Sequence, residues 1–144
     1  MQNFNYERLS LAGIALGMME AALEDSIAWA QQRETFGKPL IKHQVIRHKI
    51  ADMSAKIDAL RSLLWILCAT IEAGEMPVAE LSKAKVFATK SLEFVASEAM
   101  QILGGAGYLR GNRVESIYRD VKVIAIGGGS EEIMRDLAVR QMGL

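Results

Sequence analysis

The sequence predicts an all-α protein, an up-down-up-down four-helix bundle with an additional short C-terminal helix. Three observations support this. Long segments space their apolar residues by three and four, the period of one helix face. Glycine and proline, which commonly end helices, separate those segments, and no segment alternates apolar and polar residues as a half-buried strand does. The length of 144 residues suits a single domain, so we expect residues 1–144 to form one bundle.

The first two helices are predicted from long apolar stripes. The stripe from about Tyr6 to Arg33 is broad enough to contact neighbours on two sides, and the breakers Gly37 and Pro39 follow it. The next segment alternates spacings of four and three, as in helices that pack nearly parallel. Its seam consists of Ile46, Ile50, Met53, Ile57, Leu60, Leu64, Leu67 and Ile71. We expect the only cysteine, Cys68, to be a core residue of this helix.

The remaining helices are shorter or richer in small residues. The third should start near Pro77, which a first helical turn tolerates, and stop at the glycine-rich stretch 104–107. The fourth should cover about Val114 to Ala125, with Tyr118 on its inner face. Ser130 is the expected N-cap of the last helix. The inward residues of that helix are expected to be Ile133, Leu137 and Ala138.

Charge and composition exclude several classes of function. Lys and Arg balance Asp and Glu at 17 each, which gives no electrostatic basis for binding nucleic acid or an anionic membrane. The longest apolar run, 63–69, is too short to span a bilayer. His43 and His48 have no third ligand in view, so no metal site is expected.

One cysteine suits a reducing compartment, and we expect the bacterial cytoplasm rather than the mitochondrial matrix. Because a helical pattern starts almost at Met1, we also expect an excised or truncated piece.

Three blocks of sequence carry a resemblance to a known family. Residues 33–40 read RETFGKPL, with His43-Gln44 following; residues 101–108 read QILGGAGY; and YRD at 118–120 is followed by IGGGSEEI at 126–133. In order and spacing they resemble the C-terminal domain of acyl-CoA dehydrogenases. The resemblance implies a four-helix bundle from an enzyme that is usually a tetramer, with the N-terminal helical and middle β domains absent here.

The same resemblance implies an FAD site. A guanidinium matches phosphate geometry, so Arg33 suits the FAD pyrophosphate, although it could merely compensate the end of the first helix. Glycines let a backbone approach a cofactor closely, but they also stop helices, and both roles can hold together. The implied cofactor contacts are Arg33, Thr35, Phe36, Gln44, Gln101, Gly104, Gly105, Ser130 and Glu132.

The resemblance also indicates the catalytic base. Much of the family carries a glutamate in the loop before the last helix, where this chain has Gly128. The segment NYERL at 5–9 instead resembles the segment that carries the base in long-chain and isovaleryl members, which places the base at Glu7. Asn5, Arg8, Gly127 and Gly128 are the implied substrate-site residues. The alternative is that Glu7 is a first-turn acid complementing the helix dipole.

The expected function is therefore α,β-dehydrogenation of long-chain or branched acyl-CoA thioesters by the complete protein. Electron-transfer flavoprotein is the implied electron acceptor, and the implied assembly is a homo-oligomer, dimer or tetramer. We expect the isolated chain to be inactive. The alternatives are a related flavoenzyme, such as an acyl-CoA oxidase or nitroalkane oxidase, and a non-catalytic oligomerisation module.

Overall fold

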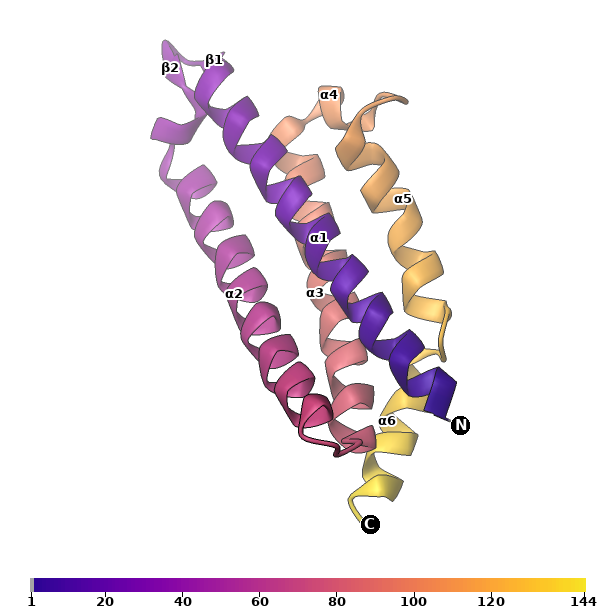
Figure 1. Cartoon of the computed structure of the whole chain (residues 1–144). Coiled ribbons are helices and arrows are strands. Elements are labelled where there is room, and N and C mark those ends of the chain that lie inside the picture. Colours follow the sequence, from indigo (N-terminus) through magenta and orange to yellow (C-terminus); the bar gives the residue numbers. More distant parts are fainter. Residues whose placement is uncertain (1) are drawn as a thin grey trace.

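The protein consists of long helices packed side by side (Figure 1). The computed structural model describes residues 2–144, with side chains from Phe4 onward. The helices are α1 (Gln2–Gln32), α2 (Gln44–Glu72), α3 (Val78–Leu103), α4 (Gly105–Tyr108), α5 (Arg113–Ile126) and α6 (Glu131–Gln141). Between α1 and α2 lie the strands β1 (Glu34–Thr35) and β2 (Lys38–Pro39) and the 3₁₀ turn η1 (Leu40–Lys42). The hairpin and α4 lie at one end of the bundle, and the N-terminus and α6 lie at the other. The predicted all-α class is confirmed.

Helix α3 is the centre of the bundle. It packs against α1, α2, α5 and α6, and its most extensive interface is with α1. Both helices bury many small side chains, and small side chains at a contact let helix axes approach closely. The buried alanines are Ala12, Ala15, Ala22 and Ala30 on α1, and Ala79, Ala84, Ala88, Ala96 and Ala99 on α3.

The predicted seam of α2 is confirmed, but the prediction for Cys68 was wrong. Six seam residues are buried, and Ile50 and Ile71 are partly buried against the core. Cys68 is exposed, since it follows the buried Leu67 by one residue and therefore lies about 100° around the helix. The outer face of α2 also exposes Trp65 and Ile66.

The same one-residue geometry explains two further errors. Tyr118 is exposed next to the buried Ile117, and Ile133 is exposed next to the buried Met134. On α6 the inward stripe runs through Met134 and Ala138, and a residue beside such a stripe points about 100° away from it.

Three predicted helix ends are confirmed in position. Helix α3 starts directly after Pro77 and ends at Leu103, with Gly104, whose φ is 59°, as its C-cap. The glycine-rich stretch then forms the single turn α4. Ser130 occupies the predicted N-cap position of α6, although its side chain makes no capping hydrogen bond.

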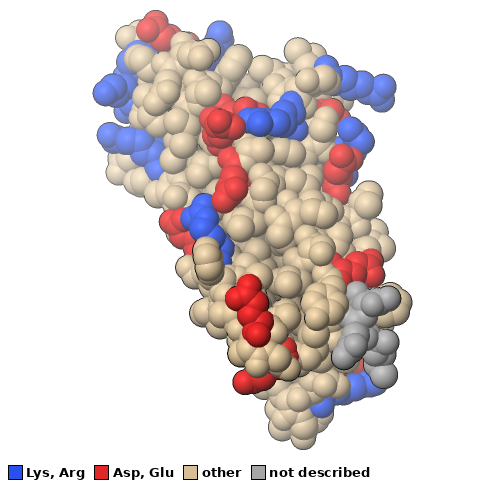
Figure 2. All heavy atoms as spheres, in the orientation of Figure 1, with Lys and Arg blue, Asp and Glu red and all other residues tan. Residues whose placement is uncertain are grey.

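The surface carries charges of both signs. Figure 2 shows acidic and basic side chains interspersed on the face that carries α1, unlike the continuous basic stripe of a nucleic-acid-binding surface. Within residues 2–144, no helix combines the length and apolar character needed to cross a membrane.

Candidate functional site

One group of predicted site residues meets at the hairpin end of the bundle. Arg33 follows α1, Thr35 lies in β1, and Gly104 and Gly105 form the junction of α3 and α4. All four line one cavity of about 420 Å³. Gln101, in the last turn of α3, lines a neighbouring cavity of about 860 Å³ that Gly104 also borders. The fold therefore brings together residues that the sequence separates by about seventy positions.

The hairpin tip is held in a strained conformation. Phe36 and Gly37 have φ values of 52° and 77°, and a turn with two positive φ values matches the right-handed twist of the flanking strands. For a residue other than glycine, this conformation costs roughly 1–2 kcal/mol. The Thr35 hydroxyl lies 3.2 Å from His43 Nε2, and the Phe36 ring meets the His43 ring edge-on with centroids 6.3 Å apart. His43 immediately precedes Gln44, the first residue of α2, so these contacts anchor the tip to α2.

The hairpin end fits a phosphate-bearing ligand. Arg33 is exposed, so its guanidinium is accessible to an anion from outside the chain. A Cβ added at Gly104 or Gly105 would meet no atom within 4 Å among the described residues. The packing of the chain therefore does not require glycine at Gly105, and the space in front of this backbone is open to a ligand.

A second group of predicted residues meets at the opposite end of the bundle. Arg8 Nη1 donates a hydrogen bond of 2.9 Å to Oδ1 of the buried Asn5, and Arg8 Nε donates one of 3.4 Å to the carbonyl of Gly128. These bonds connect the start of α1 to the connection between α5 and α6, which includes Gly127.

Glu7 and Gly128 border the same space. An ideal Cβ at Gly128 would lie 3.8 Å from Glu7 Oε1. It would also lie 2.6 Å from Leu11 Cδ1, and Gly128 has a φ of +67° that favours glycine. The Glu7 carboxylate is exposed at this end of the bundle. A carboxylate at either position would thus face one common region.

Ser130 and Glu132 belong to this second end and not to the Arg33 cavity. The backbone N–H of Glu132 and the Ser130 hydroxyl, as hydrogen-bond donors, hold the pKa of the Glu132 carboxyl below its usual value. An ionised carboxylate accepts hydrogen bonds and repels phosphate, so Glu132 is suited to hydroxyl or N–H groups of a ligand.

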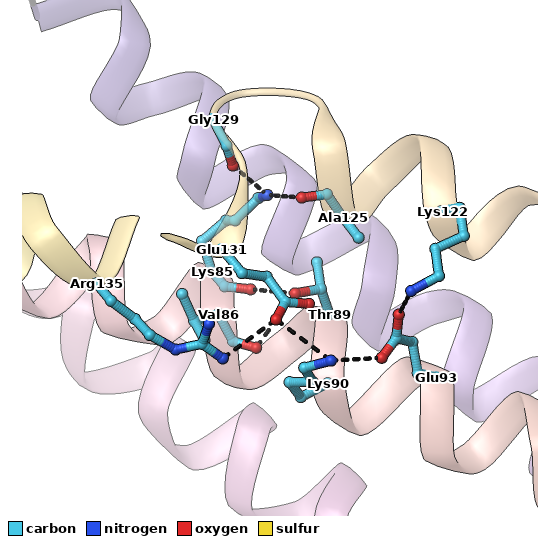
Figure 3. A network of polar contacts seen from close by, with 10 residues as sticks. All are labelled: Lys85, Val86, Thr89, Lys90, Glu93, Lys122, Ala125, Gly129, Glu131 and Arg135. Carbon is cyan, nitrogen blue, oxygen red and sulfur yellow. Dashed lines mark hydrogen bonds and ion pairs between the residues drawn. The ribbon is translucent and has the colours of Figure 1, made fainter. Parts of the chain in front are cut away.

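The sequence analysis missed Lys85, which supports the second end from inside (Figure 3). This fully buried lysine of α3 donates hydrogen bonds of 2.6 Å to the carbonyls of Ala125 and Gly129. Burial lowers the pKa of its ammonium, the negative charge of Glu131 raises it, and the positive charge of Arg8 lowers it. One signal was available in the sequence: Lys85 falls on the apolar stripe of α3, four residues after Leu81.

Glu131 fastens the start of α6 to α3 beside Lys85. Its carboxylate is nearly buried and lies 3.3 Å from Lys90 Nζ and 3.1 Å from Arg135 Nη2. Lys90 also pairs with Glu93, which accepts a further bond from Lys122 of α5 (Figure 3). The connection between α5 and α6 is thus flanked by polar contacts to α3 on both sides.

Comparison with known proteins identifies similar sequences and folds. The sequence model of the family described as acyl-CoA dehydrogenase, C-terminal domain, matches residues 1–143. A 3-(aryl)acrylate reductase from Clostridium sporogenes is 36% identical over 135 residues, which cover 94% of this chain and 36% of that protein. The crystal structure of a probable acyl CoA dehydrogenase from Mycobacterium abscessus superposes with a TM-score of 0.96 at 41% identity, covering 99% of this chain and 38% of that one. Butyryl-CoA dehydrogenase from Megasphaera elsdenii gives a TM-score of 0.94 at 34% identity, covering 100% and 38%.

Proposed function

The chain belongs to the acyl-CoA dehydrogenase family, and from this premise we propose that it is the C-terminal helical domain of an FAD-dependent enzyme that oxidises acyl-CoA thioesters. The chain spans little more than a third of the length of the relatives it matches. The complete enzyme would also contain an N-terminal helical domain and a middle β domain. The proposed substrates are long-chain or branched acyl groups, and the proposed electron acceptor is electron-transfer flavoprotein.

We assign the α-proton base to Glu7. In this reaction the carboxylate takes the proton from Cα, a hydride leaves Cβ, and a double bond forms between the two carbons. FAD, when bound, supplies the hydride acceptor. The observation that carries the assignment is the approach of position 128 to the Glu7 carboxylate, because it places the glycine and the acid at one site. Asn5 and Arg8 would hold the start of α1 against the Gly128 backbone, which fixes where the carboxylate acts.

The substitution Glu7→Gln in the complete enzyme tests this assignment. It keeps the side-chain shape and removes the basicity, so the rate of flavin reduction by acyl-CoA should fall by about 10²–10⁴-fold while FAD stays bound. Glu20→Gln is the matched control, because Glu20 is another exposed acid of α1 and pairs with Arg61 at the surface. Flavin reduction at the parent rate in Glu7→Gln would show that another group removes the proton.

The FAD contacts are proposed to come from two copies of the chain. Arg33, Thr35, Gly104 and Gly105 lie at the C-terminal end of α3, whereas Ser130 follows Gly129, whose carbonyl binds Lys85 in the N-terminal third of α3. Lys85 and Gly104 are 19 residues apart, about 28 Å along a helix, so the two groups are well separated within one chain. A homo-oligomer, a dimer or tetramer, would bring the Arg33 end of one copy to the Ser130 end of another. The hairpin-end contacts would include Phe36, Gln44 and Gln101, and the other end would add Glu132.

Exposed apolar side chains provide a surface for this assembly. The neighbouring residues Trp65 and Ile66 of α2 are 73% and 64% exposed, and Val45 in the first turn of α2 is 59% exposed. Large exposed apolar side chains, aromatic ones above all, are enriched in protein interfaces. Sedimentation velocity of the complete enzyme should show a dimer or tetramer, and a monomer at micromolar concentration would contradict the two-copy site.

Arg33→Met tests the phosphate contact. A hydrogen bond to a charged group contributes about 1.5–3 kcal/mol, so FAD affinity should fall roughly 10- to 100-fold. Lys38→Met is the control, since Lys38 is an exposed cation of the same hairpin. Equal flavin retention by the two variants after dialysis would refute the contact.

The name of the Clostridium sporogenes relative supports a second candidate activity. That protein is a 3-(aryl)acrylate reductase, so reduction of a conjugated double bond is represented among the relatives. In that direction the protonated Glu7 would deliver the proton to Cα, and the reduced flavin, when bound, would supply the hydride for Cβ. Anaerobic assays in both directions distinguish the two activities, and rapid reaction of the reduced enzyme with oxygen would instead indicate an oxidase.

A further inference from the structure

We propose that Lys85 is a positioning residue that fixes the α5–α6 connection, and with it the Gly128 backbone, at the correct distance from Glu7. The inference rests on the proposed function, because it gives the connection a role beside the base.

The α5–α6 connection cannot hold its own shape. Residues 127–129 are all glycine, and Gly128 and Gly129 have φ values of +67° and +113°. Glycine loses more conformational freedom on folding than any other residue. The backbone hydrogen bonds described for this stretch lie at its two ends, from Gly127 N to the Val123 carbonyl and from Met134 N to the Ser130 carbonyl. The middle of the connection must therefore be restrained by other parts of the molecule.

Two cations from different helices provide this restraint. Arg8 of α1 binds the Gly128 carbonyl, and Lys85 of α3 binds the carbonyls of Gly129 and Ala125. Ala125 lies in the last turn of α5, where carbonyls lack partners within the helix. One ammonium thus joins the end of α5 to the glycine stretch, as Figure 3 shows.

The chemistry of Lys85 requires an explanation other than packing. Its side chain is fully buried among the inward residues of α3, where an apolar chain of similar length would avoid the cost of desolvating an ammonium. The charge is compensated locally, since Glu131 is nearly buried at the start of α6 and acts electrostatically on Lys85. The distinctive property of lysine here is the ability to donate to two carbonyls at once.

A displaced connection would change the site. Ideal Cβ atoms at Gly128 and Gly129 would lie 2.6 Å from Leu11 Cδ1 and 2.5 Å from Met134 Cε, so this backbone packs closely against α1 and α6. Any shift of the connection therefore alters its distance from the start of α1, which carries Glu7. Misplacement by about 1 Å can cost a reaction roughly 10²-fold.

The test uses the complete, FAD-loaded enzyme with Lys85→Met. Hydrogen–deuterium exchange should become faster at the amides of Gly127 and Met134, whose backbone hydrogen bonds lie at the two ends of the connection, and stay unchanged at Leu92 and Val95 in the core of α3. The kcat should fall by about 10²-fold, with a smaller change in KM. Lys83→Met is the matched control, because Lys83 lies two residues earlier on α3 and its side chain is 51% exposed; this variant should match the parent in every measurement.

Lys85→Gln keeps the proposal testable if Lys85→Met does not fold. Its amide retains N–H donors without the charge and should preserve part of the exchange protection. Parent-like exchange at the amides of Gly127 and Met134 in the folded variants would overturn the proposal, as would faster exchange with an unchanged kcat. Failure of the base assignment is separate, because it would appear as an active Glu7→Gln enzyme, whereas the exchange measurement requires no catalysis.

Discussion

Moving the carboxylate from position 7 to position 128 tests whether the two positions serve one reacting carbon. The double variant Glu7→Thr with Gly128→Glu removes the proposed base from α1 and places an acid on the α5–α6 connection. Because a Cβ at position 128 would lie 3.8 Å from the present Glu7 Oε1, the new side chain starts beside the space that the old carboxylate occupies. We expect partial recovery of the activity lost in Glu7→Thr alone.

The structure also sets the size of the recovery. Removing a general base costs about 10²–10⁴-fold. A glutamate at 128 must adopt a φ near +67°, at a cost of roughly 1–2 kcal/mol, and must displace the Leu11 Cδ1 atom that would lie 2.6 Å from its Cβ. An off-rotamer Leu11 adds about 0.5–1.5 kcal/mol. Since about 1.4 kcal/mol corresponds to a factor of ten, the relocated acid should remain roughly one to two and a half powers of ten below the parent rate.

The assay is anaerobic stopped-flow bleaching of the flavin after mixing with acyl-CoA. Leu11→Ala, added to the double variant, removes the crowded methyl group and should bring the acid closer to its optimal position. The shared-site argument is refuted if the flavin-loaded, folded double variant reduces its flavin no faster than Glu7→Thr alone.

Three further predictions concern stability and cofactor retention. In urea titrations, Leu60→Ala should lower the free energy of unfolding by about 2–5 kcal/mol, because Leu60 is fully buried on the α2 seam. The control Leu109→Ala, at an exposed position, should change it by less than about 0.5 kcal/mol. Hydrogen bonds from Lys122 and Lys90 hold the pKa of Glu93 below its ordinary 4.5. Ionised Glu93 therefore stabilises the fold above that pH, and this contribution disappears as the pH falls through the lowered pKa. The variant Glu93→Gln should lose less stability in acid than the parent, and an unchanged dependence of stability on pH would contradict this. The isolated 144-residue chain should not retain FAD, because it contains only part of the site, and a stoichiometric flavin absorbance after dialysis would disprove the prediction.

The helices themselves were predictable because their apolar residues repeat with a helical period. The seam of α2 was correct at every position, since a long stripe averages over local irregularities. The errors fell where two large apolar residues are adjacent, as at Ile133 and Met134. Periodicity over eleven residues does not determine which of two neighbours faces the core, because that depends on where the partner helix lies.

The candidate site was predictable in part. The family resemblance paired Glu7 with Gly128, and the structure brings the two positions together. The spacing of residues along the sequence does not predict that Arg8 binds the Gly128 carbonyl or that Lys85 binds two carbonyls. Every residue has a backbone carbonyl, so the sequence does not mark which carbonyl accepts a hydrogen bond. The two-ended distribution of the cofactor contacts likewise depends on how the helices are arranged in space.

The order of helices along the chain has a consequence for synthesis on the ribosome. Helix α1 packs most extensively on α3, yet the end of α3 is translated roughly seventy residues after the end of α1. At a translation rate of about 5–20 residues per second, the apolar stripe of α1 remains without its main packing partner for several seconds. During that interval α2 can cover one side of the stripe, and the side destined for α3 stays accessible to chaperones or to other nascent chains.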